Sequence, residues 1–233
     1  MSTPPPLRGI SSMATRQVLA ELTAAYAARV PEAGPVQIES VGGVDAAKRV
    51  AAGEAFDVVI LATDAIDRLM AAGHLLPGSK VDWVHSGVAV AVPAGAPLPD
   101  LSSEDAVRAA VLAAPSISLS TGPSGVALSK LFERWGIAEQ IAPRMVQAPP
   151  GVPVGSLVAK GEVALGFQQL SELLHVQGIQ IAGPLPPAIQ ITTTFSAGVG
   201  VHSQQADAAR ALLAYLASPA AADAKQKQGM TPA

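Results

Sequence analysis

The chain has 233 residues, of which 49% are hydrophobic and 14% charged. This length and this share of apolar residues are enough to form one large hydrophobic core or two smaller ones. Its net charge of −3 and aromatic content of 3% argue against a nucleic-acid partner, since neither a basic surface nor stacking platforms are expected. The absence of cysteine excludes disulfides, thiolate metal sites and catalytic thiols.

The first residues give a prediction about location. Residues 1–6 read as a short lead-in without the basic start and apolar stretch of a signal peptide. No apolar run approaches the length of a membrane span, so no direct membrane insertion is expected. As written, the chain predicts a cytoplasmic protein; a periplasmic location follows if a signal has been removed.

Strands and helices alternate in the first third of the chain. A helix is predicted from near Ser12 to Pro31, and short helices over 44–52 and 64–72. Strands are predicted over 36–41 and 57–62, the second an unbroken apolar run typical of a strand buried on both faces. This βαβ order indicates a parallel sheet wrapped by helices.

The pattern continues after residue 82 with further elements. Ser102 and Asp105 resemble a capping box for a helix that runs to Ala113. The predicted strands and helices of this part are the strands 88–92, 116–120, 144–148, 163–167 and 179–182, the extended run 192–202, and helices over 128–135, 153–160, 171–176, 206–216 and after Pro219.

These elements group into two lobes. Residues 7–84 with 199–233 are expected to form lobe 1, and residues 85–198 lobe 2. The segments near 84–92 and 192–202 are predicted to cross between them. The fold class is therefore α/β, each lobe a mainly parallel sheet flanked by helices, with two crossing strands as a hinge. Clefts between lobes are common ligand sites.

Several strand-to-helix junctions carry small and hydroxyl residues. The first turn of a helix has free N–H groups and a partial positive charge, so it suits an anion. The candidate ligand-binding residues at such junctions are Ser11, Ser12, Met13, Gly42, Gly43, Val44, Thr63, Thr121, Gly122, Ser124 and Gly125. Ser11 and Ser12 could equally be simple helix caps. The basic residues nearest these turns, Arg16, Lys48 and Arg49, are expected mostly at the surface.

These motifs together resemble a known family. The order Ser11–Ser12, Gly42–Val44, Phe56–Ala62, Gly122–Gly125 and Gly161–Phe167 is similar to type II periplasmic substrate-binding proteins of the molybdate-binding group. The resemblance covers nearly the whole chain from residue 7. It implies a two-lobed, Venus-flytrap receptor for a small anion, held by hydroxyls and backbone N–H groups, and an ABC transporter membrane component as partner.

The resemblance also assigns positions. Ser12 matches the first serine ligand, Gly43 falls in the second serine-bearing turn, and Val152 or Pro153 falls in the third contact loop. Gln169, next to Gln168, stands where the family often has a tyrosine. Glycine and an amide in place of two hydroxyls suit a carboxylate at least as well as molybdate.

An enzymatic alternative stays open. The same resemblance includes isomerases that act on small tricarboxylates such as aconitate, which need a proton shuttle but no cofactor. The candidates for that shuttle are Ser12, His85 and Asp64. The histidine spacing gives no metal motif, so neither a metal nor a cofactor is expected.

Overall fold

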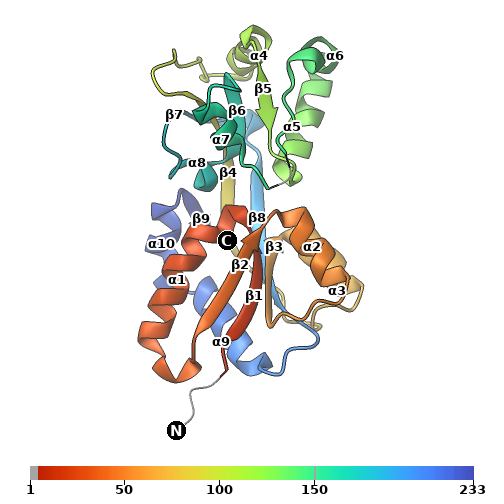
Figure 1. The fold of residues 1–233 in the computed structure, drawn as a ribbon, viewed down its shortest axis with the longest axis vertical. Coiled ribbons are helices and arrows are strands. Elements are labelled where there is room, and N and C mark those ends of the chain that lie inside the picture. Colours follow the sequence, from red (N-terminus) through yellow and green to blue (C-terminus); the bar gives the residue numbers. More distant parts are fainter. Residues whose placement is uncertain (1–4, 150) are drawn as a thin grey trace. The chain divides into compact units, whose positions relative to one another are not determined.

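A computed structural model describes residues 5–149 and 151–233 and divides the chain into two compact units (Figure 1). Unit 1 contains residues up to His85 and from Thr194 onward, and unit 2 contains Ser86–Thr193. Strands β4 (Val81–Pro93) and β8 (Thr192–Val199) each contribute residues to both units. Of the lead-in predicted for residues 1–6, the part up to Pro4 lies outside the described residues.

The sheet of unit 1 has the strand order β2-β1-β3-β8-β4, and β9 also pairs with β4. β1 is parallel to β2 and to β3, whereas β8 is antiparallel to β3. The strands not yet bounded are β1 (Leu7–Ser12), β2 (Val36–Val41), β3 (Val58–Ala62) and β9 (Met230–Pro232).

Helices cover both faces of this sheet. Figure 1 shows α1, α9 and α10 on one face and α2 and α3 on the other. Their bounds are α1 (Arg16–Arg29), α2 (Gly43–Ala51), α3 (Thr63–Ala71), α9 (Ala206–Ala217) and α10 (Ala222–Lys227), with 3-10 turns η1 (Met13–Thr15), η2 (Pro31–Ala33) and η5 (Pro219–Ala221).

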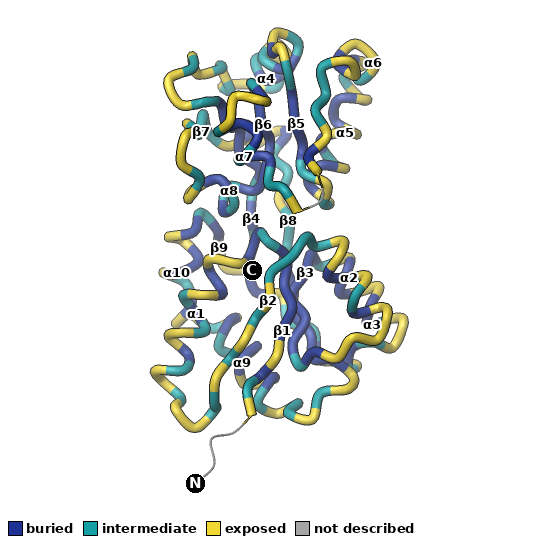
Figure 2. Tube along the Cα trace, viewed as in Figure 1, coloured by how far each residue is buried: buried dark blue, intermediate teal, exposed yellow. Residues whose placement is uncertain are grey.

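Strand β3 explains why both faces need helices. All five of its residues are buried, as Figure 2 shows for the centre of the sheet. Val58 and Ile60 pack in the apolar cluster of α1 and α9, while Val59 and Leu61 pack in the cluster of α2 and α3. The unbroken apolar run in the sequence is the direct consequence of this two-sided burial.

Unit 2 is built around a mixed sheet. β4 is antiparallel to β6 and β7, and β5 is parallel to β6. Its other elements are β5 (Ile117–Leu119), β6 (Leu165–Gln169), β7 (Ile179–Pro184), α4 (Glu104–Ala113), α5 (Pro123–Arg134), α6 (Ala138–Ile141), α7 (Val154–Ala159), α8 (Leu170–Leu173), η3 (Ala142–Arg144) and η4 (Pro187–Ile189).

Four details differ from the sequence-based expectations. The sheet of unit 2 is not mainly parallel, because β4, which begins in unit 1, runs antiparallel to both β6 and β7. The segment 144–148 is no strand; only Met145 forms an isolated bridge, to Ile117. Residues 194–198 belong to unit 1, since β8 pairs with β3 from Phe195 onward. Helix α4 is capped by Ser103, whose hydroxyl accepts from Ala106 N at 3.1 Å, and not by Ser102.

No helix within residues 5–149 and 151–233 is both long enough and apolar enough to cross a membrane.

Candidate functional site

Three strand-to-helix junctions of unit 1 open at one edge of its sheet. Because β1, β2 and β3 are parallel, their last residues Ser12, Val41 and Ala62 lie at the same end, which we call the carboxyl edge. η1 and α3 begin immediately after Ser12 and Ala62, and α2 begins one residue further on, after Gly42. The free N–H groups of these helix starts are therefore gathered at the carboxyl edge.

Ser12 is the residue at this edge with an unmet hydrogen-bonding need. It is 7% exposed, and its Oγ is buried with no hydrogen-bond partner among the described residues. It precedes η1 but makes no side-chain cap, so the simple capping role does not account for it. A buried hydroxyl without a partner is uncommon and calls for an explanation.

Gly43 lies against Ser12. A Cβ built on Gly43 would sit 3.4 Å from Ser12 Cβ, which brings the start of α2 next to the end of β1. Gly42 is the residue before that helix, Met13 is partly buried in η1, and Val44 is 47% exposed. The structure therefore brings together the first two predicted turns.

Ser11 has a different environment from its neighbour. It is fully buried, and its Oγ lies 2.8 Å from Ser40 Oγ on the adjacent strand β2. This hydroxyl is already used in a contact between β1 and β2, so we do not assign Ser11 to the ligand.

Thr63 begins α3 at the same edge and contacts β4. Its Oγ1 lies 3.5 Å from Asp82 Oδ1, which also accepts a 2.5 Å hydrogen bond from Ser196 Oγ. Asp64 is exposed and forms an ion pair with Arg68, one turn along the same helix. His85 Nδ1 lies 3.0 Å from Thr194 Oγ1. Of the three predicted proton-transfer residues, Ser12 and His85 are at least partly buried and Asp64 is on the surface.

The glycine-rich turn of unit 2 is built around Ser124. Ser120 Oγ and Ser124 Oγ are 2.8 Å apart, and Ser124 is buried in the first turn of α5. A Cβ on Gly125 would come 1.6 Å from the Ser120 carbonyl oxygen, so this turn requires glycine. Thr121 is exposed and Gly122 precedes the helix.

The two glutamines at the end of β6 have different partners. Gln169 Nε2 donates to Thr193 Oγ1 at 2.8 Å, while its Oε1 is buried without a partner among the described residues. Gln168 accepts from Gly155 N and donates to Glu172 Oε1, both at 2.9 Å. Gln168 thus serves the interior of unit 2. The predicted third contact, Val152 and Pro153, is partly buried just before α7.

Glu172 is a titratable group whose surroundings the sequence did not reveal. Burial raises the pKa of its carboxyl to about 7, and the hydrogen bond from Gln168 opposes that rise. The sequence placed Glu172 with His175 on a short helix and favoured a surface role. A carboxyl with a pKa near neutrality can exchange a proton at physiological pH.

Other polar groups were missed for the same reason, that burial is not visible in residue type. Within the described chain, Trp83 Nε1, Ser86 Oγ and Ser118 Oγ are buried without a hydrogen-bond partner. Lys225 is fully buried as well. Nothing in the sequence marks Lys225 as buried, because it stands in a polar run with Asp223, Gln226 and Lys227.

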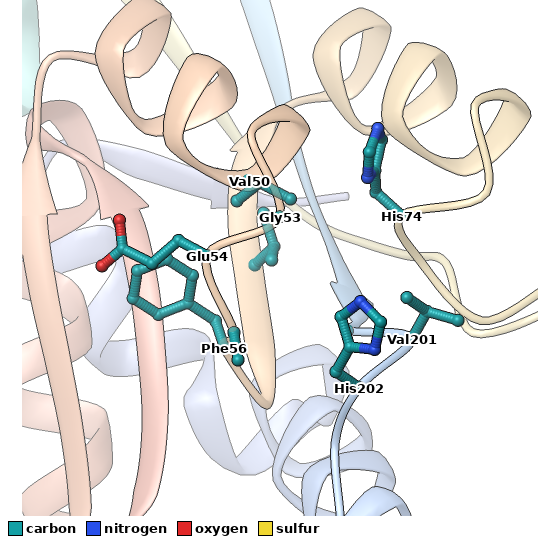
Figure 3. A pocket seen from close by; sticks show the side chains of 10 residues that line it. Val50, Gly53, Glu54, Phe56, His74, Val201 and His202 are labelled. Carbon is teal, nitrogen blue, oxygen red and sulfur yellow. The ribbon is translucent and has the colours of Figure 1, made fainter.

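A small pocket of unit 1 lies at the opposite edge of the sheet from Ser12. Figure 3 shows Phe56, which comes just before β3, and His202, which follows β8, on its wall. His74 and Glu54 also line it. The pocket is therefore separate from the predicted junctions. Across the described residues, no three His, Cys, Asp or Glu side chains are grouped to hold a metal.

A protein-family comparison matches almost the whole chain. The model for bacterial extracellular solute-binding proteins covers residues 7–231. An aconitate isomerase from Pseudomonas sp. is 43% identical over 185 residues, which are 79% of this chain and 70% of that protein.

Solved structures confirm the predicted fold class. The periplasmic molybdate-binding protein of Azotobacter vinelandii matches with a TM-score of 0.79 at 20% identity, over 97% of this chain and 98% of that one. The sulfate-binding protein of Mycobacterium tuberculosis H37Rv matches with a TM-score of 0.78 at 17% identity, over 98% and 87%. The tungstate-binding protein of Desulfovibrio alaskensis G20 matches with a TM-score of 0.70 at 15% identity, over 99% of both. With its family match from residue 7 to residue 231, the chain belongs to the bacterial extracellular solute-binding proteins.

Proposed function

We propose that this solute-binding protein takes a small organic polycarboxylate, and that the carboxyl edge of unit 1 supplies its donors. The observation that carries the proposal is the Ser12 hydroxyl, which is buried and has no hydrogen-bond partner among the described residues. Gly43 at the start of α2 and Thr63 at the start of α3 are the neighbouring donors, through their backbone N–H groups. Oriented donors of this kind neutralise an anion without a basic contact residue.

The residue types favour a carboxylate over a tetrahedral oxyanion. The resemblance to molybdate-binding proteins leads us to expect a hydroxyl in the second turn and a tyrosine at the end of β6. The chain has Gly43 and Gln169 at these places. The name of the Pseudomonas relative supports a tricarboxylate, aconitate, as the first ligand to test.

Thermal unfolding and calorimetry test this proposal. A ligand at a hundred times its Kd stabilises the fold by about 2.7 kcal/mol, enough to move the melting temperature by several degrees. We expect cis- or trans-aconitate to do so, with molybdate, tungstate, sulfate and phosphate weaker. If no anion of this panel raises the melting temperature or gives a heat of binding, the proposed function is wrong.

Unit 2 carries its own proposed ligand contacts. Ser124, the Thr121–Gly122 turn, the Val152–Pro153 turn and Gln169 are candidates from the sequence. Gln169 can donate to a carboxylate only through its Nε2, which here donates to Thr193 Oγ1, because its Oε1 can only accept. The variant Gln169→Leu is expected to weaken aconitate binding on the order of tenfold, the effect of losing one hydrogen bond to a charged group. An unchanged Kd would remove Gln169 from the site.

An isomerase is a second candidate function, favoured by the 43% identity to an aconitate isomerase. Moving the double bond of aconitate requires removal of a proton from the methylene carbon next to a carboxylate and return of a proton to the far carbon of the allylic system. His85, Ser12 and Asp64 are the proposed shuttle residues. Of these, His85 is partly buried and oriented by Thr194, whereas Asp64 is exposed and paired with Arg68.

Proton NMR separates the two functions. The protein is incubated with cis-aconitate in deuterated buffer, and the trans isomer and deuterium in the methylene group are followed. A purely binding protein gives neither. If conversion occurs, His85→Gln is expected to slow it at least a hundredfold, the typical value of a positioned acid or base.

Location and transport partner stay proposals as well. The family's description as extracellular favours a periplasmic site of action, where an ABC transporter membrane component is the expected partner. Fractionation of cells that express the full-length gene product, followed by detection with an antibody, tests the location.

A further inference from the structure

Lys225 of α10 is a buried positive charge without a negative partner. The side chain is fully buried, and its Nζ donates to the Trp83 carbonyl oxygen at 2.7 Å. It also lies 5.6 Å from the centre of the Trp83 ring. No carboxylate in residues 5–149 and 151–233 forms an ion pair with it. Burying an unpaired charge is costly, and burial accordingly lowers the pKa of this lysine.

Trp83 adds an unmet donor at the same place. Its indole Nε1 is buried and has no acceptor in the described part of the chain. Buried donors normally have acceptors. Two neighbouring residues therefore both offer donors, one of them cationic, and no ion pair neutralises the Lys225 ammonium among the described residues.

This region lies at the carboxyl edge of unit 1. Ala62, the last residue of β3, pairs with Phe195 of β8. The adjacent Ser196 bonds to Asp82 of β4, so Trp83 is level with the end of β3. In the other direction along the sheet, Ser11 pairs with Ile60 of β3, which brings Ser12 to the same level.

Packing links the lysine to the first helix junction. Ala14, two residues after Ser12, belongs to the same apolar cluster as Trp83 and Ala224, the residue before Lys225. Figure 1 shows α10 beside α1, and the two helices are in contact. Ser12 itself faces Gly43, so the lysine lies behind the proposed donors and not among them.

We propose that Lys225 supplies the positive charge that balances a carboxylate bound at the carboxyl edge of unit 1. This inference rests on the proposed function and names the counter-charge of that site. The ammonium acts through the protein interior, where charges are only weakly screened, and needs no direct contact with the ligand. The Trp83 carbonyl holds it in place.

The test uses two neutral variants of Lys225 and a matched control. Lys225→Met removes the charge and fills the space, and Lys225→Gln keeps a donor for the Trp83 carbonyl without the charge. Lys227→Met removes a charge from the same helix at an exposed position, where Lys227 pairs with Glu21. Kd values for trans-aconitate and for the dicarboxylate itaconate are measured by calorimetry, together with the free energy of unfolding.

A charge effect has a distinct signature. We expect both Lys225 variants to bind trans-aconitate on the order of tenfold more weakly, itaconate about threefold more weakly, and to unfold no more easily than the wild type. Lys227→Met should bind as the wild type does. Where one Lys225 variant fails to fold, the other decides.

Two results would overturn the inference. One is a folded Lys225 variant whose Kd for trans-aconitate stays within twofold of the wild-type value. The other is an equal loss for both ligands, which a merely structural role predicts. If the wild-type protein binds no carboxylate, the proposed function fails first and this inference with it.

Discussion

Two adjacent serines at the end of β1 have opposite roles. Ser11 Oγ is paired with Ser40 Oγ, whereas Ser12 Oγ is buried and unpaired. Residue type does not distinguish them, and only the resemblance to the molybdate-binding group pointed to Ser12. Only the direction of each side chain, toward β2 or toward α2, decides which hydroxyl is available.

This contrast gives a matched pair of variants. Ser12→Ala should leave the free energy of unfolding nearly unchanged, because no hydrogen bond of the free protein is lost. It should weaken aconitate binding about tenfold. Ser11→Ala leaves Ser40 without its partner and should cost about 1 kcal/mol of stability while binding is retained. Urea unfolding and calorimetry of both variants check this; retained binding in Ser12→Ala would contradict it.

Glu172 makes stability depend on pH in an identifiable direction. Burial raises its pKa from 4.5 to about 7 in the folded protein. The folded state therefore binds a proton more tightly than the unfolded state, and this contribution to stability is present below pH 4.5 and is lost as the pH rises through 7. From the size of the shift, the loss amounts to about 1–3 kcal/mol.

Glu172→Gln should remove this dependence. The amide carbonyl can still accept from Gln168, and nothing remains to ionise. We expect the variant to be more stable than the wild type at pH 8 and similar at pH 5, as measured by urea unfolding at both values. Glu162→Gln, at an exposed position in the same unit, serves as the control. Equal pH profiles for the wild type and Glu172→Gln would contradict the assignment.

At the scale of elements, we expect the start of α2 to set ligand preference. Gly43 has no side chain there, and a Cβ would meet Ser12 Cβ at an ordinary 3.4 Å. Gly43→Ser therefore fits and adds the hydroxyl expected in an oxyanion-binding turn. We expect the ratio of molybdate to aconitate affinity to rise on the order of tenfold, the worth of one hydrogen bond to a charged group.

Gly43→Ala is the control for this change. Both substitutions favour the helix over glycine by roughly 0.5–1 kcal/mol, so both should raise stability slightly. Only the serine should change the ligand ratio, as measured by calorimetry with the two anions. The same ratio in both variants would mean that Gly43 does not face the ligand.

Secondary structure was predicted best from the sequence where buried residues produce a clear pattern of apolar side chains. β3 and α2 lie within a residue or two of the expected ranges, because an apolar run and an amphipathic pattern fix them. The strand predicted over 144–148 was wrong, because this segment forms only one isolated bridge with β5, between Met145 and Ile117. β9 was missed since three residues give no period.

The candidate site was predictable only at its helix starts. Ser12, Gly43 and Thr63 follow three parallel strands, and the order of strands and helices is enough to place them at one edge. Lys225 and Trp83 could not be found this way. They come from α10 and β4, and the buried ammonium and the unmet indole donor both arise from tertiary packing that joins residues far apart in the sequence.

At the scale of the whole molecule, two strands link the units. Trp83 and Val84 of β4 pack in the core of unit 1, and Val88 and Val90 of the same strand pack in the core of unit 2. β8 likewise has residues in both units. Unit 1 is also assembled from two separate chain segments, so it cannot be completed before unit 2, the continuous segment Ser86–Thr193 between them, has been made.

We therefore expect the two units to unfold together. The chain has two tryptophans, Trp83 in unit 1 and Trp135 in unit 2. In Trp135→Phe the fluorescence reports unit 1, in Trp83→Phe it reports unit 2, and circular dichroism reports both. Loss of either unit breaks strands on which the other depends, so within each variant the fluorescence and dichroism midpoints in urea should coincide. If the fluorescence transition precedes the dichroism transition in one variant, the unit that holds the remaining tryptophan unfolds alone. In that case β4 and β8 do not couple the unfolding of the two units.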